Sequence, residues 1–265
     1  MKTSQADRSE LTQAVVTDQL RTLRVREGGV VLVHSSFRAT RPVQGGVLGL
    51  IAAMRQALGP NGTLVMPSET ADDDEIFDPA TTPPAAALGA VPGLFWRLPG
   101  VQRSRHFAAF AAIGPEAERI VSAPLTLPPH APGSPISVVH QLDGQVLLLG
   151  VEHDCNSMMH LAEIVGGAPY RVPRHYTELR DGRPARVDYG ENDHCCQRFV
   201  LAGEWLKAEG LQSEGRVGYA EARLAYARDI VHLVTQRVAA DPLLFLHPSG
   251  TGCVECETAR ASIAV

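Results

Sequence analysis

One apolar segment, residues 145–151, constrains the fold more than any other part of the chain. Its sequence, Gln-Val-Leu-Leu-Leu-Gly-Val, has no polar side chain after the first residue, which predicts a strand that is buried on both faces. Strands of this kind belong to sheets that carry helices on both sides, so we expect an α/β fold. In open α/β sheets, reactive groups gather at the carboxyl ends of the strands. Functional residues are therefore expected directly after this segment.

The residues that follow the strand are indeed polar and titratable. If a helix begins with Asp154 or Asn156 as its N-cap, then Ser157, His160 and Glu163 follow at three-residue spacing and share one helical face. An imidazole titrates near neutral pH, so His160 is a candidate general base, with Glu163 as the acid that orients it. The alternative is a buried histidine that bonds only to the backbone. Ser157 and Asp154 join the catalytic candidates as members of the same cluster.

The wider pattern predicts one domain. Residues 30–33, 47–58 and 63–66 form a strand, a helix and a second strand, which indicates a partly parallel sheet. Further elements are expected as follows: helices at 9–24, 115–121, 196–209 and 220–239, and strands at 107–113, 186–189 and 243–246. We therefore expect residues 1–265 to form a single α/β domain with a central mixed sheet flanked by helices. Residues 68–100 form an inserted helical and loop-rich excursion in it, and residues 187–265 a helical C-terminal portion.

Polar groups also follow the first predicted strand. His34, Ser35, Ser36 and Phe37 come directly after it, and Gly45-Gly46 precedes the next helix. Hydroxyls and backbone amides at such a position can hold a phosphate or an amide-rich ligand, although a plain helix cap would use the same residue types. A serine nucleophile is less well supported, because the G-x-S-x-G elbow is absent.

The charge pattern favours a cationic small molecule as the ligand. The net charge is -5, which excludes the basic footprint of a nucleic-acid-binding protein. Acidic runs occur at 72–75 and 191–193; if they meet in one cleft, they would concentrate a ligand of the opposite charge, and otherwise they are solvated loops. No nucleotide-binding glycine motif is present. Without an apolar run long enough for a membrane span or a secretory signal, we expect no membrane partner and a cytoplasmic location.

The cysteines suggest a metal rather than disulfides. Five cysteines without an export signal indicate reduced thiols. Cys253 and Cys256 have the C-x-x-C spacing of half a zinc site, and we expect His194 and Cys196 to complete a structural Cys₃His site. The alternative is a few unrelated thiols.

Several motifs together resemble a known family. The resemblance is carried by residues 33–37, 57–67, 77–79, 147–151 and 153–163. These segments are similar to the aminoglycoside 3-N-acetyltransferases, which do not share the common N-acetyltransferase (GNAT) superfold. Within that family, residues 127–130, 191–196 and 253–256 resemble the type IV enzymes that act on apramycin and gentamicin. Ser157 departs from the pattern, because the family commonly has threonine there.

The resemblance implies a reaction and a set of roles. An acetyl group would pass from acetyl-CoA to the 3-amino group of the 2-deoxystreptamine ring of an aminoglycoside such as apramycin, gentamicin or tobramycin, giving antibiotic resistance. His160 would remove the proton of that amine, and Glu163 would orient it. The positions that contact the antibiotic would be Asp73, Asp74, His130, Glu191 and Asp193, and those that line the CoA path would be His34, Ser35, Ser36, Phe37, Gly45 and Gly46. Asp72 extends the acidic run and leaves open which aspartate faces the drug.

Direct transfer is expected rather than a covalent acyl-enzyme. Cys155 lies beside Asp154 and gains no stabilisation of its thiolate from that neighbour, so Cys155→Ala ought to leave most turnover intact. Two rival hypotheses remain: an acetyl-CoA-dependent enzyme that acts on another amine, and a non-catalytic protein that binds cationic drugs. The sequence allows either a monomer or a homodimer.

Overall fold

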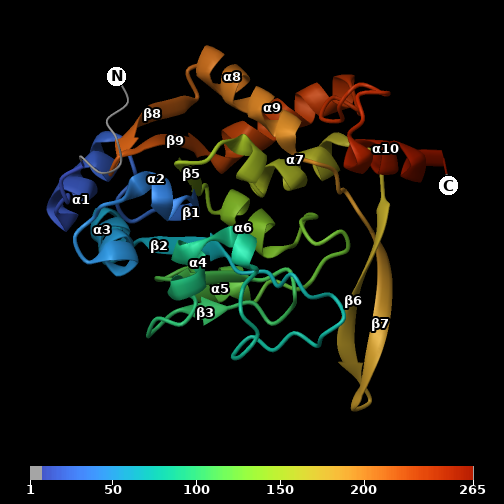
Figure 1. Ribbon diagram of the computed structural model, residues 1–265, viewed down its shortest axis with the longest axis horizontal. Helices are drawn as coiled ribbons and strands as arrows, with labels where there is room; N and C mark the ends of the chain where they lie inside the picture. The colour runs from blue at the N-terminus through green and yellow to red at the C-terminus, as the bar shows by residue number, and fades with distance from the viewer. Residues whose placement is uncertain (1–7, 265) are drawn as a thin grey trace.

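A seven-stranded mixed sheet forms the centre of the computed structural model, which describes residues 8–264 (Figure 1). The strand order is β3-β4-β2-β1-β5-β9-β8. The strands are β1 (Val30–Ser35), β2 (Thr63–Pro67), β3 (Gln102–Arg103), β4 (Phe110–Ile113), β5 (Gln145–Leu149), β8 (Gln212–Val217) and β9 (Ala220–Tyr226). Strand β1 runs parallel to both β2 and β5, and the remaining pairs are antiparallel. The predicted α/β fold with a mixed sheet is confirmed.

Helices cover both faces of the sheet. Alternate residues of each strand point to opposite faces, so Val31 and Val33 of β1 pack on one side while Val30 and Leu32 pack on the other. The first side is covered by α1 (Gln13–Thr22), α3 (Gly46–Leu58) and α4 (Ala90–Phe95). The second side is covered by α5 (Ala117–Val121), α6 (Pro135–Gln141), α7 (Met158–Gly166), α8 (Val200–Ala208), α9 (Ala227–Ala240) and α10 (Val254–Ala261).

A long hairpin projects from the body of the molecule (Figure 1). Its strands, β6 (Val172–Arg180) and β7 (Arg183–Glu191), pair with each other and form a separate two-stranded sheet. The excursion that follows β2 reaches this hairpin, where Ile76 forms a bridge with Thr177. Residues 68–100, expected as an excursion, consist of loops and short helices that include α4, and their contact with the hairpin is a finding of the structure.

The C-terminal portion differs from the expectation in two places. Residues 220–226 form β9 instead of the first turns of a helix, because they pair with β5 on one side and β8 on the other. Residues 243–246, expected as a strand, form a turn that buries Phe245 in the core. The portion from residue 187 onward is thus not purely helical, since it also contains β8 and β9. Among the described residues, no helix is both long enough and apolar enough to span a bilayer.

The fold brings three strand ends to one place. Because β1, β2 and β5 are parallel, their carboxyl ends lie at the same edge of the sheet. This edge carries His34 and Ser35 at the end of β1, Glu69 after β2, and the turn that leads to α7 after β5. Gly150 lets the last of these turns pass close to its neighbours: its φ is +68°, and a Cβ there would lie 2.6 Å from the Cβ of Ala39.

Candidate active site

Buried hydrogen bonds fix the turn between β5 and α7. The Asn156 side chain accepts the N–H of Met158 through Oδ1 at 3.0 Å and so supports the start of α7. Its Nδ2 donates to Nδ1 of His153 at 3.1 Å, and Nε2 of His153 lies 2.8 Å from Oε1 of Gln212. Both nitrogens of the His153 ring are thus occupied, and this residue holds the turn in place rather than taking part in chemistry.

His160 and Glu163 form the centre of the site. Nδ1 of His160 lies 3.4 Å from Oε2 of Glu163, one turn along α7. The Glu163 side chain is completely buried, and its Oε1 accepts hydrogen bonds from Tyr170 Oη and, at 3.0 Å, from His194 Nε2. Burial raises the pKa of Glu163, but the bonds from His160 and His194 outweigh burial and lower it. A charged carboxylate therefore faces Nδ1 of His160.

The other side of the His160 ring is open to a ligand. The ring stacks on His130 with centroids 5.3 Å apart and meets the edge of Phe199 at 5.2 Å. Its Nε2 lies 3.8 Å from Sγ of Cys196, and the side chain is 21% exposed. Burial lowers the pKa of His160, but Cys196 and Glu163 together raise it well above 6.5. An Nδ1–H directed at Glu163 leaves Nε2 as the nitrogen that can accept a proton.

The remaining catalytic candidates lie beside this pair. Ser157 occupies the N-cap position of α7, and its carbonyl accepts the N–H of His160 at 3.2 Å, but its hydroxyl forms no capping bond. Asp154 is exposed, and its carboxylate interacts with the Cys155 thiol. Neither geometry supplies a direct role at His160, so both residues stay hypotheses.

Two carboxylates from different segments lie near His160, and a third lies near a tyrosine that bonds to one of them. Glu69 is near enough to His160 and Glu191 for their charges to act on it, and Asp73 acts in the same way on Tyr189, which bonds to Glu191. Burial raises the pKa of Glu69 to about 7, and burial also raises the pKa values of Asp73 and Glu191. One member of each acidic run, Asp73 and Glu191, therefore acts on Tyr189, and Glu69 lies near Glu191.

The structure distinguishes the three consecutive aspartates. Asp72 Oδ1 accepts the backbone N–H groups of Asp74 and Glu75, so its carboxylate holds the turn. Asp74 Oδ1 bonds to Nε2 of His175 at 2.8 Å, and its side chain is 86% exposed. Asp73 is the partly buried member, and its charge acts on Tyr189 of the hairpin.

The other two predicted drug contacts have partners within the protein. Asp193 forms an ion pair with Arg174 of β6. His130 stacks on His160, and Nδ1 of His130 is buried without a hydrogen-bond partner. Burial, followed by the charge of His160, lowers the pKa of His130 to about 3. A neutral His130 can therefore offer its free nitrogen to a ligand, while Asp193 must share its charge with an arginine.

The predicted CoA residues occupy the same sheet edge. Nε2 of His34 and Oγ of Ser35 are buried without partners, and burial lowers the pKa of His34 to about 3. Ser36 is the N-cap residue of the short helix α2 (Phe37–Thr40). Gly45 and Gly46 both have positive φ and form the start of α3, where a Cβ on Gly46 would meet nothing within 4 Å. These residues combine unpaired polar atoms with an open helix N-terminus.

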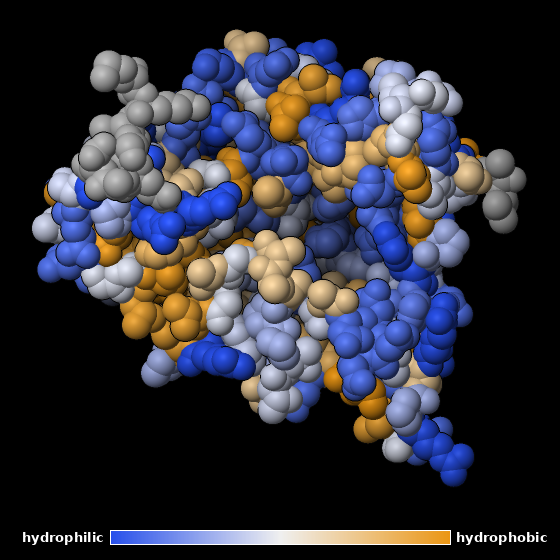
Figure 2. All heavy atoms as spheres, in the orientation of Figure 1, coloured by the Kyte–Doolittle hydropathy of each residue, from blue (hydrophilic) through white to orange (hydrophobic). Residues whose placement is uncertain are grey.

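The space-filling view shows where a ligand can enter. A hollow lined mainly by hydrophilic residues opens near the centre of the face drawn in Figure 2, below the position that α7 has in Figure 1. A separate cavity of about 840 Å³ lies between the excursion and the hairpin, lined among others by Phe77, Arg103 and Tyr176. None of the predicted site residues lines that cavity, so its volume is no guide to the site around His160.

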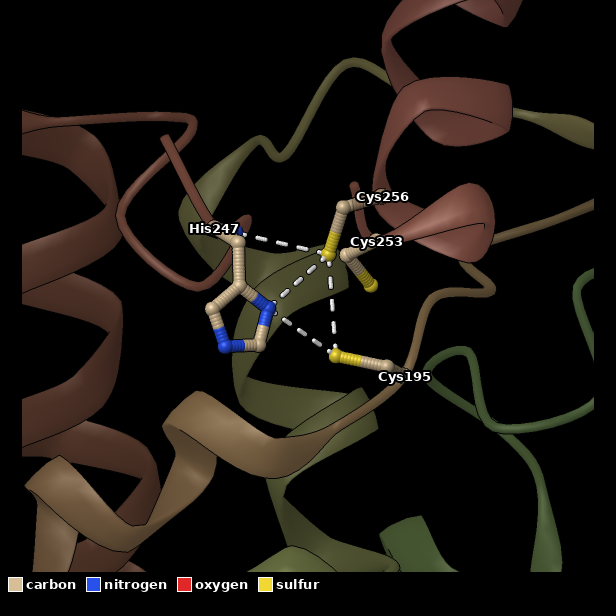
Figure 3. Close-up of side chains that lie close together, drawn as sticks. All are labelled: Cys195, His247, Cys253 and Cys256. Carbon is tan, nitrogen blue, oxygen red and sulfur yellow. Dashed lines mark hydrogen bonds between the residues drawn. The ribbon is translucent and has the colours of Figure 1, made fainter. Parts of the chain in front are cut away.

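The cysteine cluster has different members from those expected. Cys253 and Cys256 lie beside Cys195 and His247, not beside Cys196 and His194 (Figure 3). The expected set is corrected for a geometric reason. The side chain of Cys195 points toward α10, whereas those of its two neighbours point the other way, toward Glu163 and His160.

Some residues of the site were missed in the sequence. The position of Glu69 was a usable signal. It lies just past the end of β2, His34 lies at the end of β1, and parallel strands share their carboxyl edge. Tyr170 and the contact of Cys196 with His160 gave none, since both depend on how the chain returns after α7.

Comparisons with known proteins identify relatives of this chain. Residues 32–239 match the model of the aminoglycoside 3-N-acetyltransferase family. An aminoglycoside N(3)-acetyltransferase IV from Salmonella sp is 59% identical over 243 residues, which cover 92% of this chain and 93% of the relative. The crystal structure of the AAC(3)-IVa apoenzyme matches with a TM-score of 0.96 at 59% identity, covering 98% of this chain and 100% of that one.

A second solved structure shows a ligand. It is a histidine-to-alanine mutant of AAC(3)-IVa in complex with a gentamicin, and it matches with a TM-score of 0.96 at 58% identity, covering 98% of this chain and 100% of that one. The family model, the relative and the two structures all cover the segments that build the site around His160. The chain therefore belongs to the aminoglycoside 3-N-acetyltransferase family.

Proposed function

We propose that the protein transfers the acetyl group of acetyl-CoA to the 3-amino group of the 2-deoxystreptamine ring of aminoglycosides such as apramycin and gentamicin. One observation carries the proposal: His160, backed by the buried carboxylate of Glu163, lies beside a group of partly buried carboxylates. A polycationic drug suits this acidic wall, which consists of the carboxylates of Glu69, Asp73 and Glu191. The relative named an aminoglycoside N(3)-acetyltransferase IV supports the same assignment.

The reaction needs a proton to leave the attacking amine. A neutral amine attacks the thioester carbon, Nε2 of His160 takes the amine proton, and the CoA sulfur leaves as the C–S bond breaks. The proton on His160 can then pass to the leaving thiolate. Glu163 stabilises the imidazolium that forms in between. Charge-assisted bonds from the carboxylates to the drug's other ammonium groups would hold the reacting amine in place.

Acetyl-CoA would bind at the neighbouring strand end. Ser35 Oγ and His34 Nε2 can bond to the amides of the pantetheine arm, because both atoms are buried without partners. The start of α3 at Gly45-Gly46 can receive a phosphate. Acetyl-CoA is a cytoplasmic metabolite, so the proposal also places the protein in the cytoplasm. A structural metal ion, which we propose as a second bound group, would lie outside this site.

The direct test is to detect the acetylated drug. Purified protein is incubated with acetyl-CoA and apramycin or gentamicin, and the product is measured by mass, because five protein cysteines would disturb a thiol dye. An increase of one acetyl group on the drug supports the proposal. Product from non-aminoglycoside amines alone would favour an enzyme for another amine, and drug binding without product would favour a binding protein.

Substitution of the thiol that lies near the general base distinguishes direct transfer from a covalent acyl-enzyme. Cys196 lies 3.8 Å from Nε2 of His160, but its backbone N–H donates to Nδ1 of His194 at 3.0 Å and so cannot stabilise an oxyanion. We therefore expect Cys196→Ala to keep turnover within about tenfold of wild type. Cys155→Ala, whose thiol has its pKa raised to about 11 by burial and Asp154, is the matched control. An acetyl group that accumulates on the protein with acetyl-CoA alone would contradict direct transfer.

Among the three aspartates, Asp73 is expected to matter most for the drug. Asp73→Asn removes one negative charge from the acidic wall. It should raise the KM for gentamicin about 10- to 100-fold, since a hydrogen bond to a charged group contributes about 1.5–3 kcal/mol. Asp72→Asn is the control, because an amide oxygen can still accept the N–H groups of Asp74 and Glu75. Steady-state kinetics check both variants. Equal effects from the two substitutions would reject this assignment.

Glu69 should make drug binding depend on pH. Its pKa of about 7, raised by burial, means that it gains charge as the pH rises from about 6 to about 8. Drug affinity should therefore fall as the pH is lowered through this range, and calorimetry across the range measures the change. In Glu69→Gln the affinity should be lower on the alkaline side, and the slope around neutral pH should be reduced. An unchanged slope in the variant would assign the effect to another group.

A further inference from the structure

Four side chains that the proposed reaction does not use converge at the C-terminal end of the chain. They are Cys195, His247, Cys253 and Cys256, and their ligand atoms all lie within 4.8 Å of one another (Figure 3). Cys195 comes from the segment after β7, His247 from the segment after α9, and the other two from the start of α10. Residues far apart in the sequence thus supply one compact group of three sulfurs and one imidazole nitrogen.

The spacing of these atoms fits a tetrahedral metal. A zinc ion with Zn–S bonds of about 2.3 Å places its sulfur ligands about 3.8 Å apart. Sγ of Cys195 lies 3.6 Å from Sγ of Cys256, and Nδ1 of His247 lies 3.3 Å and 3.5 Å from these two sulfurs. Cys253 completes the set, since its Sγ lies within 4.8 Å of the other three ligand atoms, and it also lies 3.6 Å from the carboxylate of Glu255.

The surroundings of the cluster suit a structural site. Cys256 is completely buried, and its Sγ accepts the backbone N–H of His247 at 3.3 Å. Such N–H groups stabilise the negative charge of a metal-bound thiolate. Arg260 bonds to the carbonyl of His247, and Arg198 bonds to that of Leu244 at 3.0 Å. The loop that carries the imidazole is therefore held at two points by bonds within the protein.

We infer that Cys195, His247, Cys253 and Cys256 bind one Zn²⁺ ion. Three thiolates and an imidazole match the soft ligands and the tetrahedral geometry that zinc prefers. All four positions are filled by protein atoms, which is typical of a structural rather than a catalytic ion. The ion fastens α10 and the loop at 241–252 to the segment at 193–197.

The position of Cys195 links this ion to the active site. Its two sequence neighbours face the other way: His194 bonds to Glu163 at 3.0 Å, and Cys196 lies 3.8 Å from His160. A metal that fixes Cys195 therefore also fixes the backbone from which these two side chains reach the catalytic pair. The ion acts as a positioning element and does not touch the substrate.

Zinc content of the purified protein tests the inference without any substrate. Protein prepared with zinc present is dialysed against EDTA and analysed by mass spectrometry of the metal. Wild type and the control Cys155→Ser, whose thiol is exposed and outside the cluster, should retain one zinc per chain. Cys253→Ser, which changes the partly exposed ligand, should lose most of its zinc and unfold several degrees lower. Cys195→Ser should lose it as well.

Cobalt substitution gives a second measurement. Protein reloaded with Co²⁺ should show thiolate-to-cobalt charge-transfer bands and the visible bands of tetrahedral cobalt, and Cys253→Ser should weaken both. Wild type without metal after preparation in zinc, zinc retained in both serine variants, or an intact mass two hydrogens lower from a disulfide would each overturn the inference. Since no drug or CoA is used, these outcomes are separate from failure of the proposed acetyl transfer.

Discussion

Replacing His160 with alanine is expected to lower kcat by about 10²- to 10⁴-fold, the range that general base catalysis contributes. Nε2 of this residue is the proton acceptor beside the acidic wall. The imidazole that stacks on His160 cannot replace it as the general base. That imidazole, His130, has its pKa lowered to about 3 by burial and by His160, so it is a far weaker base. Single-turnover measurements with saturating gentamicin separate this loss from slow product release.

Drug binding should persist in the same variant. The His160 side chain is 21% exposed, and its removal leaves Glu69, Asp73 and Glu191 in place to meet the ammonium groups. Calorimetry should give a Kd within about tenfold of wild type, which corresponds to about 1.4 kcal/mol. A folded variant that turns over at the wild-type rate would remove His160 from the mechanism.

Replacing Glu163 should have the second largest effect, and it should affect both stability and pH dependence. Glu163→Ala removes the acceptor of Tyr170 and His194 and leaves His160 without its counter-charge. Breaking a buried pair of this kind costs about 3–5 kcal/mol. Urea unfolding at constant pH measures the loss. A destabilisation below about 1 kcal/mol would mean that the three donors find other partners, since that is the scale of an ordinary net hydrogen bond.

The isosteric variant Glu163→Gln isolates the electrostatic part. In wild type, Cys196 and Glu163 outweigh burial and hold the pKa of His160 well above 6.5, so the neutral base forms only as the pH rises through that higher value. The rising limb of kcat/KM should therefore lie above pH 6.5. Without the Glu163 charge the pKa of His160 falls, and the limb moves to lower pH. The other groups around the ring, His34, His130, His194, Glu69 and Glu191, are the same in both proteins.

A pH profile of kcat/KM for both proteins measures this shift. The drug amine must also be neutral to react, and its own pKa contributes an identical limb to both profiles. At pH values above both limbs, the variant should still be slower because its amide orients the imidazole less well. A limb that stays in place in Glu163→Gln would show that this carboxylate does not set the proton affinity of the base.

The sequence predicted best what depends on local pattern. The apolar run at 145–151 correctly indicated a buried strand, observed at Gln145–Leu149, and the three-residue spacing of Ser157, His160 and Glu163 correctly indicated one helical neighbourhood. The helix predicted at 220–239 is wrong for residues 220–226, which pair with two strands. The alternation of Ala220, Ala222 and Leu224 with charged residues was the signal available in the sequence.

What the sequence could not give was the direction of neighbouring side chains in irregular segments. His194, Cys195 and Cys196 are consecutive, and nothing in their order tells which of them faces α7 and which faces α10. His247 lacked any motif of its own and became a candidate ligand only through the path of the chain after α9. Long-range packing decides both questions, and it leaves no periodic trace in a single sequence.

The contact between the excursion and the hairpin β6–β7 means that part of the acidic wall and the catalytic pair are held by different parts of the fold. Asp74 bonds to His175, the carbonyl of Asp73 accepts a bond from Thr177, and Phe107 stacks on Tyr176 at 4.7 Å, so Asp73 and Asp74 are fastened to the hairpin, whereas Glu69 directly follows β2 of the sheet. The catalytic pair, in contrast, is set on α7 over the buried core. Substitutions in the hairpin can therefore reshape the range of accepted antibiotics while the reacting groups stay fixed.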